Sequence, residues 1–246
     1  MNTLNTLMNH SRAHRTGWFV LLLAGLVLGG CAASGSRSDP FARGEDREPT
    51  PRTLHMMSRV LIAQSQPDRA EYVLRNLIGQ HEGYSPAYVE LARLLAATGR
   101  GDEAEGVLER GIERTPGDPV LLNNLGVLRL RTADVDAAAE AFAGAVESSP
   151  GEARYVSNLA LARGMQGRAE ESLALYLRVV PEAEARWNVA TALENAGDRA
   201  GALAAYAAAH ELDPELGADA EAARLRTLLA DLAAVPTGGS VNGPED

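Results

Sequence analysis

Residues 119–152 read PVLLNNLGVLRLRTADVDAAAEAFAGAVESSPGE, and this stretch holds one full period of a pattern that recurs along the chain. A short side chain returns every 34 residues, once after 30, and a large side chain follows it four positions later. The short residues are Ala70, Ala104, Ala138, Ser172 and Ala202, and the large ones are Leu74, Leu108, Phe142, Tyr176 and Tyr206. The four-residue spacing predicts helices that approach closely at the short residue and fill the remaining gap with the large one.

A second helix face repeats in the same register, ahead of the first. It carries Met57, Leu91, Leu125, Leu159 and Val189, which are followed by Ser58, Ala92, Gly126, Ala160 and Ala190. The turns between the two helices fall at Gly99, Gly167 and Gly197, and the closing prolines are Pro116, Pro150 and Pro214. One such helix pair cannot bury its apolar face alone, so successive pairs must stack.

The register Asn124-Leu125-Gly126, Ala138, Phe142, Ala145, Pro150 resembles the tetratricopeptide repeat (TPR). This resemblance implies an all-α fold, a right-handed superhelix (α-solenoid) of about five helix-turn-helix repeats; a generic alanine-rich helical bundle is the alternative. The expected repeats are about 51–84, 85–118, 119–152, 153–182 and 183–216, followed by a capping helix over 217–235. Pro181 must stop the second helix of the fourth repeat early, which predicts a displaced helix pair after it.

The first 30 residues have the features of a secretory signal peptide, a cationic start followed by the apolar run from Trp18 to Leu28. The run is too short to span a membrane. Leu28-Gly29-Gly30-Cys31 resembles the bacterial lipobox, in which the signal peptidase recognises the residues before a cysteine that receives the lipid. We therefore expect residues 1–30 to be removed and Cys31 to be lipidated. The alternatives are an ordinary signal peptide with a chance cysteine, or an uncleaved anchor.

Two flanking segments are poor in apolar residues. Residues 31–50 are rich in Ser, Gly, Pro and charge, which predicts a lipidated flexible tether, and residues 236–246 predict a disordered tail. Residue 32 is alanine rather than the aspartate that retains Gram-negative lipoproteins in the inner membrane. By that rule the protein belongs in the cell envelope, anchored to the inner leaflet of the outer membrane and facing the periplasm.

The composition argues against several classes of function. The chain has 33 acidic and 23 basic residues and a net charge of −10, which disfavours nucleic acid as a partner. The five histidines show no metal-ligand spacing, a lysine for a phosphate-binding loop is absent, and the single cysteine allows no intramolecular disulfide. We therefore expect a non-enzymatic protein with no catalytic residues, cofactor or metal.

The TPR resemblance implies a protein-binding groove lined by the first helix of each repeat. Asn124, Asn158 and Asn188 share one groove position, where an amide can both donate to and accept from a peptide backbone. Arg59 and Arg93 share another, and Trp187 lies beside Asn188. The alternative is that the asparagines serve only local helix packing and that Trp187 fills the gap left by the short fourth repeat.

The order of segments is similar to that of the Tad/Flp pilus assembly lipoproteins called TadD and of the pilotins that deliver type IV pilus secretins. This resemblance implies an assembly chaperone whose partner is a secretin or another pilus component. The alternative function is an envelope adaptor that positions peptidoglycan enzymes or other envelope proteins. The sequence leaves self-association open.

Overall fold

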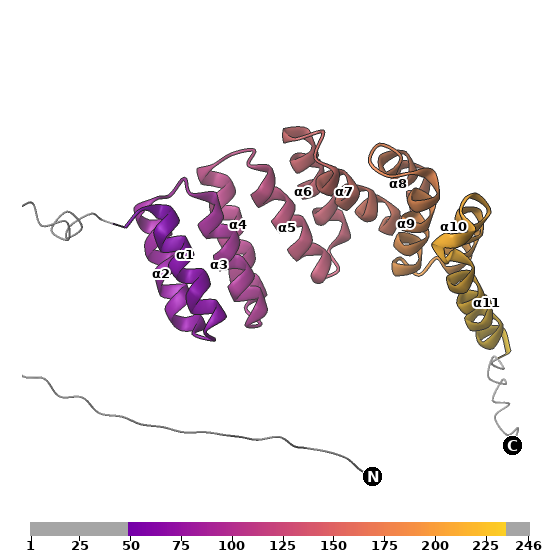
Figure 1. Ribbon diagram of the computed structural model, residues 1–246, viewed down its shortest axis with the longest axis horizontal. Coiled ribbons are helices and arrows are strands. Elements are labelled where there is room, and N and C mark those ends of the chain that lie inside the picture. Colours follow the sequence, from indigo (N-terminus) through magenta and orange to yellow (C-terminus); the bar gives the residue numbers. More distant parts are fainter. Residues whose placement is uncertain (1–48, 235–246) are drawn as a thin grey trace, which may run out of the picture. The chain divides into compact units, whose positions relative to one another are not determined.

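The computed structural model describes residues 49–234, and every regular element in this range is a helix (Figure 1). The elements are α1 (Pro51–Ala63), α2 (Pro67–Gln80), α3 (Ser85–Ala97), α4 (Gly101–Arg114), α5 (Pro119–Arg131), α6 (Val135–Ser148), α7 (Ala153–Met165), α8 (Ala169–Tyr176), α9 (Glu182–Asn195), α10 (Arg199–Leu212), the 3₁₀ turn η2 (Pro214–Leu216) and α11 (Ala218–Ala234). The predicted all-α solenoid is confirmed.

The turn inside each helix pair requires one residue with a left-handed backbone. Glycine takes that position in three pairs, with φ between 77° and 86°. In the first and third pairs the same position is held by Ser65 and Ala133, with φ of 57° and 61°. A residue with a Cβ is strained in this conformation, so these two turns are less favourable than the glycine turns.

Within a pair, close helix contact depends on the short residues of the register. A Cβ built on Gly126 of α5 would lie 2.6 Å from Cε1 of Phe142 in α6, well inside van der Waals contact. Phe142 is fully buried. The glycine therefore makes room for the aromatic ring that fills the space between the two helices.

Between pairs, the odd-numbered helices lie closer together than the even-numbered ones. Contacts join α3 to α5, α5 to α7 and α7 to α9, whereas within residues 49–234 consecutive even-numbered helices make no comparable contacts. Each even-numbered helix from α2 to α8 instead contacts the odd-numbered helix that follows it. The odd-numbered helices α3, α5, α7 and α9 therefore form the inner surface of the stack.

The fourth pair differs from the others because its second helix is short. α8 ends at Tyr176, ahead of Pro181, and a series of turns fills residues 177–180. α7 and α9 make more extensive contact than the other odd-numbered neighbours. A Cβ on Gly164 of α7 would lie 2.5 Å from the Cβ of Ala192 in α9, so glycine permits this approach.

The two ends of the stack are finished differently. α11 packs on α10 and buries Ala218, Ala222 and Leu225 almost completely, so it covers the last pair. At the other end, the outer sides of α1 and α2 expose Met57 and Tyr72. Among the described residues, no helix is long and apolar enough to cross a membrane.

Candidate protein-binding groove

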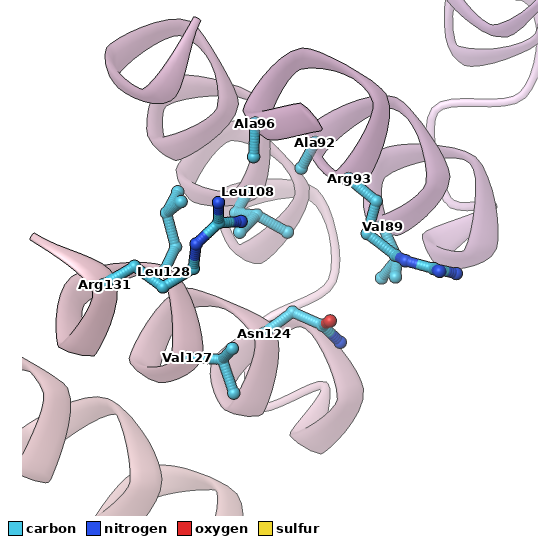
Figure 2. Close-up of a pocket in the computed structure, with 9 residues that line it drawn as sticks. All are labelled: Val89, Ala92, Arg93, Ala96, Leu108, Asn124, Val127, Leu128 and Arg131. Carbon is cyan, nitrogen blue, oxygen red and sulfur yellow. The ribbon is translucent and has the colours of Figure 1, made fainter. Parts of the chain in front are cut away.

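A hollow of about 140 Å³ lies on the inner surface, between α3 and α5, and we refer to it as the α3–α5 hollow. Its lining residues are Val89, Ala92, Arg93, Ala96, Leu108, Asn124, Val127, Leu128 and Arg131 (Figure 2). All but Leu108, which comes from α4, belong to the two neighbouring odd-numbered helices. The small residues Ala92 and Ala96 leave the space that larger side chains would fill.

The α3–α5 hollow combines an apolar floor with polar groups at its edge. Val127 is 41% exposed, which is unusual for a large aliphatic residue inside a helical stack. Figure 2 shows the guanidinium groups of Arg93 and Arg131 at different sides of the hollow, with the amide of Asn124 between them in this view. This arrangement suits an aliphatic side chain with a carboxylate close by.

The two arginines are available to a ligand. The Arg93 side chain is 69% exposed, and its Nη1 lies 3.6 Å from Oε2 of Glu90, a loose pair within the same helix. Arg131 is exposed at the end of α5. Exposed arginines keep most of their hydration and rotamer freedom, so an incoming carboxylate can recruit them through two parallel hydrogen bonds.

A second hollow of about 360 Å³ adjoins the first at Val89 and has the opposite charge. Its lining includes His55, Tyr84, Glu90 and Asp118, and it lies near the N-terminal ends of α3 and α5. The groove between these helices is therefore acidic towards their N-terminal ends and basic towards their C-terminal ends.

The structure gives the three predicted asparagines different surroundings. Asn124 lines the α3–α5 hollow; one of its N–H groups donates to the Val120 carbonyl at 2.7 Å, which leaves the amide oxygen and the other N–H for a ligand. Asn158 donates to Oδ1 of the buried Asn123 at 2.7 Å, a link between α7 and α5. Asn188 is half-buried on α9 and lines neither hollow.

The other predicted groove residues also lie in different surroundings. Arg59 is exposed on α1 and lines neither hollow, whereas Arg93 lines the first. Trp187 is half-buried, and its ring meets the ring of Tyr206 edge-on, with 5.2 Å between centroids and 79° between planes. It packs with the C-terminal part of the core. The structure therefore brings together Asn124 and Arg93 but not the other four.

The sequence reasoning did not predict Val127 and Arg131, which line the hollow, or the buried Asn123, to which Asn158 of the next repeat donates. The exposure of Val127 depends on the small size of Ala92 and Ala96 across the groove, which only the pairing of helices reveals. The Asn123–Asn158 hydrogen bond likewise joins two repeats. The predicted lipidation site Cys31 and the peptidase recognition residues 28–30 lie outside the described residues.

Comparison with known proteins identifies the repeats. Two family models match, both described as tetratricopeptide repeat, one over residues 61–125 and the other over residues 123–186. Together they span residues 61–186, about half of the chain. A search among curated proteins found no match.

Several solved structures share the fold at low sequence identity. YrrB, described as a TPR protein with an unusual peptide-binding site, is 16% identical with a TM-score of 0.54, and the match covers 72% of this chain and 93% of that one. MamA from Desulfovibrio magneticus RS-1 is 16% identical with a TM-score of 0.52, covering 67% of this chain and 96% of that one. A chain of the APC/C hetero-tetramer Cut9-Hcn1 is 12% identical with a TM-score of 0.51, and the match covers 72% of this chain and 36% of that one.

Proposed function

Because the chain is a tetratricopeptide-repeat protein, we propose that it is a protein-interaction scaffold whose α3–α5 hollow holds a segment of a partner protein. The observation that carries this proposal is the partly exposed aliphatic floor at Val127, beside Asn124 and the two exposed guanidinium groups of Arg93 and Arg131. Function then depends on recognition at this surface and on no chemical step.

The surroundings of the hollow specify what the bound segment carries. An aliphatic side chain in the hollow loses most of its contact with water, which contributes about 1.5–3 kcal/mol for a leucine-sized group. A carboxylate on one side of it meets Arg93 or Arg131, and a basic group on the other side meets Glu90 or Asp118. Asn124 adds a hydrogen bond to the backbone of the segment.

We further propose that this scaffold is a lipoprotein of the cell envelope. The lipobox-like Leu28-Gly29-Gly30-Cys31 supports lipidation at Cys31, and alanine at position 32 supports transport to the outer membrane. Residues 32–50 then act as a tether that lets the TPR domain reach partners in the periplasm. Two or three acyl chains on one residue anchor a protein far more firmly than a single chain does.

The specific role that we propose is that of an assembly chaperone, similar to a pilotin, for a Tad/Flp-type pilus or secretion system. The support is the order of segments: signal peptide, lipobox, tether, repeats and end helix. The partner is then a secretin subunit or another pilus assembly component. Under the alternative, the same anchored groove positions peptidoglycan enzymes or other envelope proteins.

A crosslinking pull-down from cell envelopes tests these proposals. The bait is the full chain, as wild type, as Cys31→Ser, as Asn124→Ala/Arg131→Glu, and as the control Arg110→Glu on the exposed side of α4. We avoid Asn158→Ala because it would leave the buried Asn123 without its partner.

The proposals make separate predictions for this experiment. A specific partner that the groove variant loses and the Arg110→Glu control keeps supports the binding groove. Capture of a secretin or pilus component supports the assembly role, whereas capture of cell-wall enzymes through the same groove replaces it with the adaptor role. Equal capture by the groove variant and the wild type refutes the groove. Release of Cys31→Ser from the membrane is expected if that cysteine carries the lipid.

A further inference from the structure

The N-terminal end of the repeat stack presents large apolar side chains to solvent. Met56 and Met57 are each 52% exposed, Val60 is 51% exposed, and Tyr72 is 70% exposed. Met57 and Tyr72 line a hollow between α1 and α2 together with Leu61, and we call these exposed apolar residues of α1 and α2 the end face. It shares no residue with the α3–α5 hollow.

Two members of the end face occupy positions that are buried in every later repeat. The counterparts of Met57 are at most 7% exposed, and those of Val60 at most 8%. These counterparts are Leu91, Leu125, Leu159 and Val189 for Met57, and Leu94, Leu128, Ala162 and Ala192 for Val60. In the later repeats the second helix of the preceding pair supplies the missing cover, and α1 has no preceding pair among the described residues.

Met56 and Tyr72 are large apolar residues at positions where the later repeats carry polar or small residues. The counterparts of Met56 are the polar residues Glu90, Asn124, Asn158 and Asn188, and those of Tyr72 are Gly106, Glu140, Ala174 and Ala204. The repeat pattern therefore does not require an apolar side chain at either position. A solenoid end that stays in water usually carries a polar outer face, and this end departs from that rule.

The opposite end of the stack does follow the rule. α11 covers α10 with Ala218, Ala222 and Leu225, and turns the exposed residues Arg224 and Arg226 outwards. Within residues 49–234, the stack thus carries a covering helix at its C-terminal end and none at its N-terminal end. Exposed apolar area of this kind marks a surface that another molecule covers.

We propose that the end face is a self-association surface that joins two copies of this chain through their first repeats. The face holds the 70% exposed ring of Tyr72 and, beside it, a hollow of about 480 Å³ that Met57, Leu61 and Val73 also line. A twofold contact lets an apolar side chain of each copy enter the hollow of the other.

The charges at the rim of this hollow fit a second copy as well. Asp68 and Arg69 are adjacent on the first turn of α2, and both line the hollow. Across a twofold axis, Asp68 of each copy can pair with Arg69 of the other copy. The same patch on both copies then forms two ion pairs. A partner of uniformly acidic or basic character would leave one of these charges facing a like charge.

The size of the end face predicts a weak dimer. Two adjacent helices of 13 and 14 residues present roughly 20 Å by 20 Å, a footprint of about 400 Å² per copy. This is below the roughly 800 Å² per partner of a stable standard interface. We therefore expect dissociation in the micromolar range, which local concentration on a membrane would offset.

Disulfide trapping tests the contact in the purified full chain, at concentrations above the expected micromolar dissociation constant. Tyr72→Cys is introduced together with Cys31→Ser, so that residue 72 carries the only thiol. The matched control is Leu212→Cys in the same background, at a 51% exposed position of α10. Mild oxidation should yield a covalent dimer with Tyr72→Cys and not with Leu212→Cys. Equal trapping at both positions, or none at residue 72, would overturn the proposal.

Sedimentation velocity of the purified full chain in detergent provides a second measurement. The wild-type chain should shift from monomer to dimer as its concentration rises. Met57→Glu should weaken dimerisation about tenfold or more, because each contact would then bury a charge against apolar residues. Leu212→Glu should leave it unchanged. A dimer that Met57→Glu does not weaken would place the contact elsewhere and refute the end face, as would a purely monomeric wild type.

Discussion

The substitution Gly126→Ala tests the packing that defines each repeat. The new Cβ would lie 2.6, 2.7 and 2.9 Å from three ring carbons of Phe142, against an ordinary contact distance of about 3.5–4.0 Å. The ring must therefore move by roughly 1 Å, and Phe142 has no exposed surface into which it can move. Overpacking of this kind costs about 1–3 kcal/mol, and full burial favours the upper end of that range.

A favourable effect offsets part of this cost. Alanine is a better helix former than glycine by about 1 kcal/mol, so the net loss for Gly126→Ala should be about 2 kcal/mol. Gly106→Ala is the matched control, because Gly106 also lies inside a helix and a Cβ there meets nothing within 4 Å. The control should gain up to about 1 kcal/mol.

Urea denaturation followed by circular dichroism measures both changes as shifts of the unfolding midpoint. Gly126→Ala should lower the midpoint and Gly106→Ala should raise it. Adding Phe142→Leu to Gly126→Ala removes the clash, so the double variant should be more stable than the sum of the single changes predicts, by at least about 1 kcal/mol. If Gly126→Ala stabilised the protein as much as Gly106→Ala does, the close approach of α5 and α6 would be refuted.

Three further predictions concern turns and titrating groups. Ala133→Gly should stabilise the protein by about 0.5–1 kcal/mol, because glycine relieves the left-handed strain that Gly99 avoids in the second repeat; a lower urea midpoint would contradict this. Burial raises the pKa of Tyr176 to about 12. The folded state therefore resists ionisation, and stability should fall by up to about 1.4 kcal/mol per pH unit above pH 10. Tyr176→Phe should flatten that alkaline loss in a denaturation series, and an unchanged slope would show that other groups cause it. Two hydrogen bonds from the Arg100 guanidinium, at 2.7 and 3.2 Å, hold the pKa of Glu71 below its usual range. The Glu71 carboxylate stabilises the folded state above its unfolded pKa, and this stabilisation is lost as the pH falls through the lowered folded pKa. Arg100→Ala should therefore make the free energy of unfolding less sensitive to acid. Because the pair is partly exposed, Arg100→Ala should lower the free energy of unfolding at neutral pH by less than about 1 kcal/mol. Acid unfolding curves of equal steepness for both proteins would argue against this pair.

The fold could be predicted from the sequence because the same packing contact recurs in every helix pair. The spacing of Gly126 and Phe142 recurs in five helix pairs, and each recurrence independently favours the same close helix contact. The residue at which α8 ends, Tyr176, was less predictable than the repeat pattern. Pro181 sets only the latest position at which that helix can stop, and packing of α9 against α7 allows it to stop sooner.

The groove was less predictable because its surface forms between repeats. Asn124 and Asn158 occupy the same register position, yet one lines the hollow and the other bonds to Asn123 on the neighbouring repeat. Arg131 reaches the hollow from the last turn of α5, a position to which the repeat pattern assigns no role. Side-chain neighbours across repeats depend on the angle between helix pairs, and no spacing within one repeat encodes that angle.

Site-specific photo-crosslinking in living cells tests the central claim most directly. A photoreactive amino acid replaces Val127 in the α3–α5 hollow of the full chain, and a control chain carries it at Leu177, an exposed position just after α8. If the groove binds the partner, the probe at position 127 should give a defined protein adduct and the probe at position 177 should not. Adding Arg131→Glu should abolish the adduct from position 127. The same adduct from both positions, or none from position 127, would contradict the groove as the binding site of this protein.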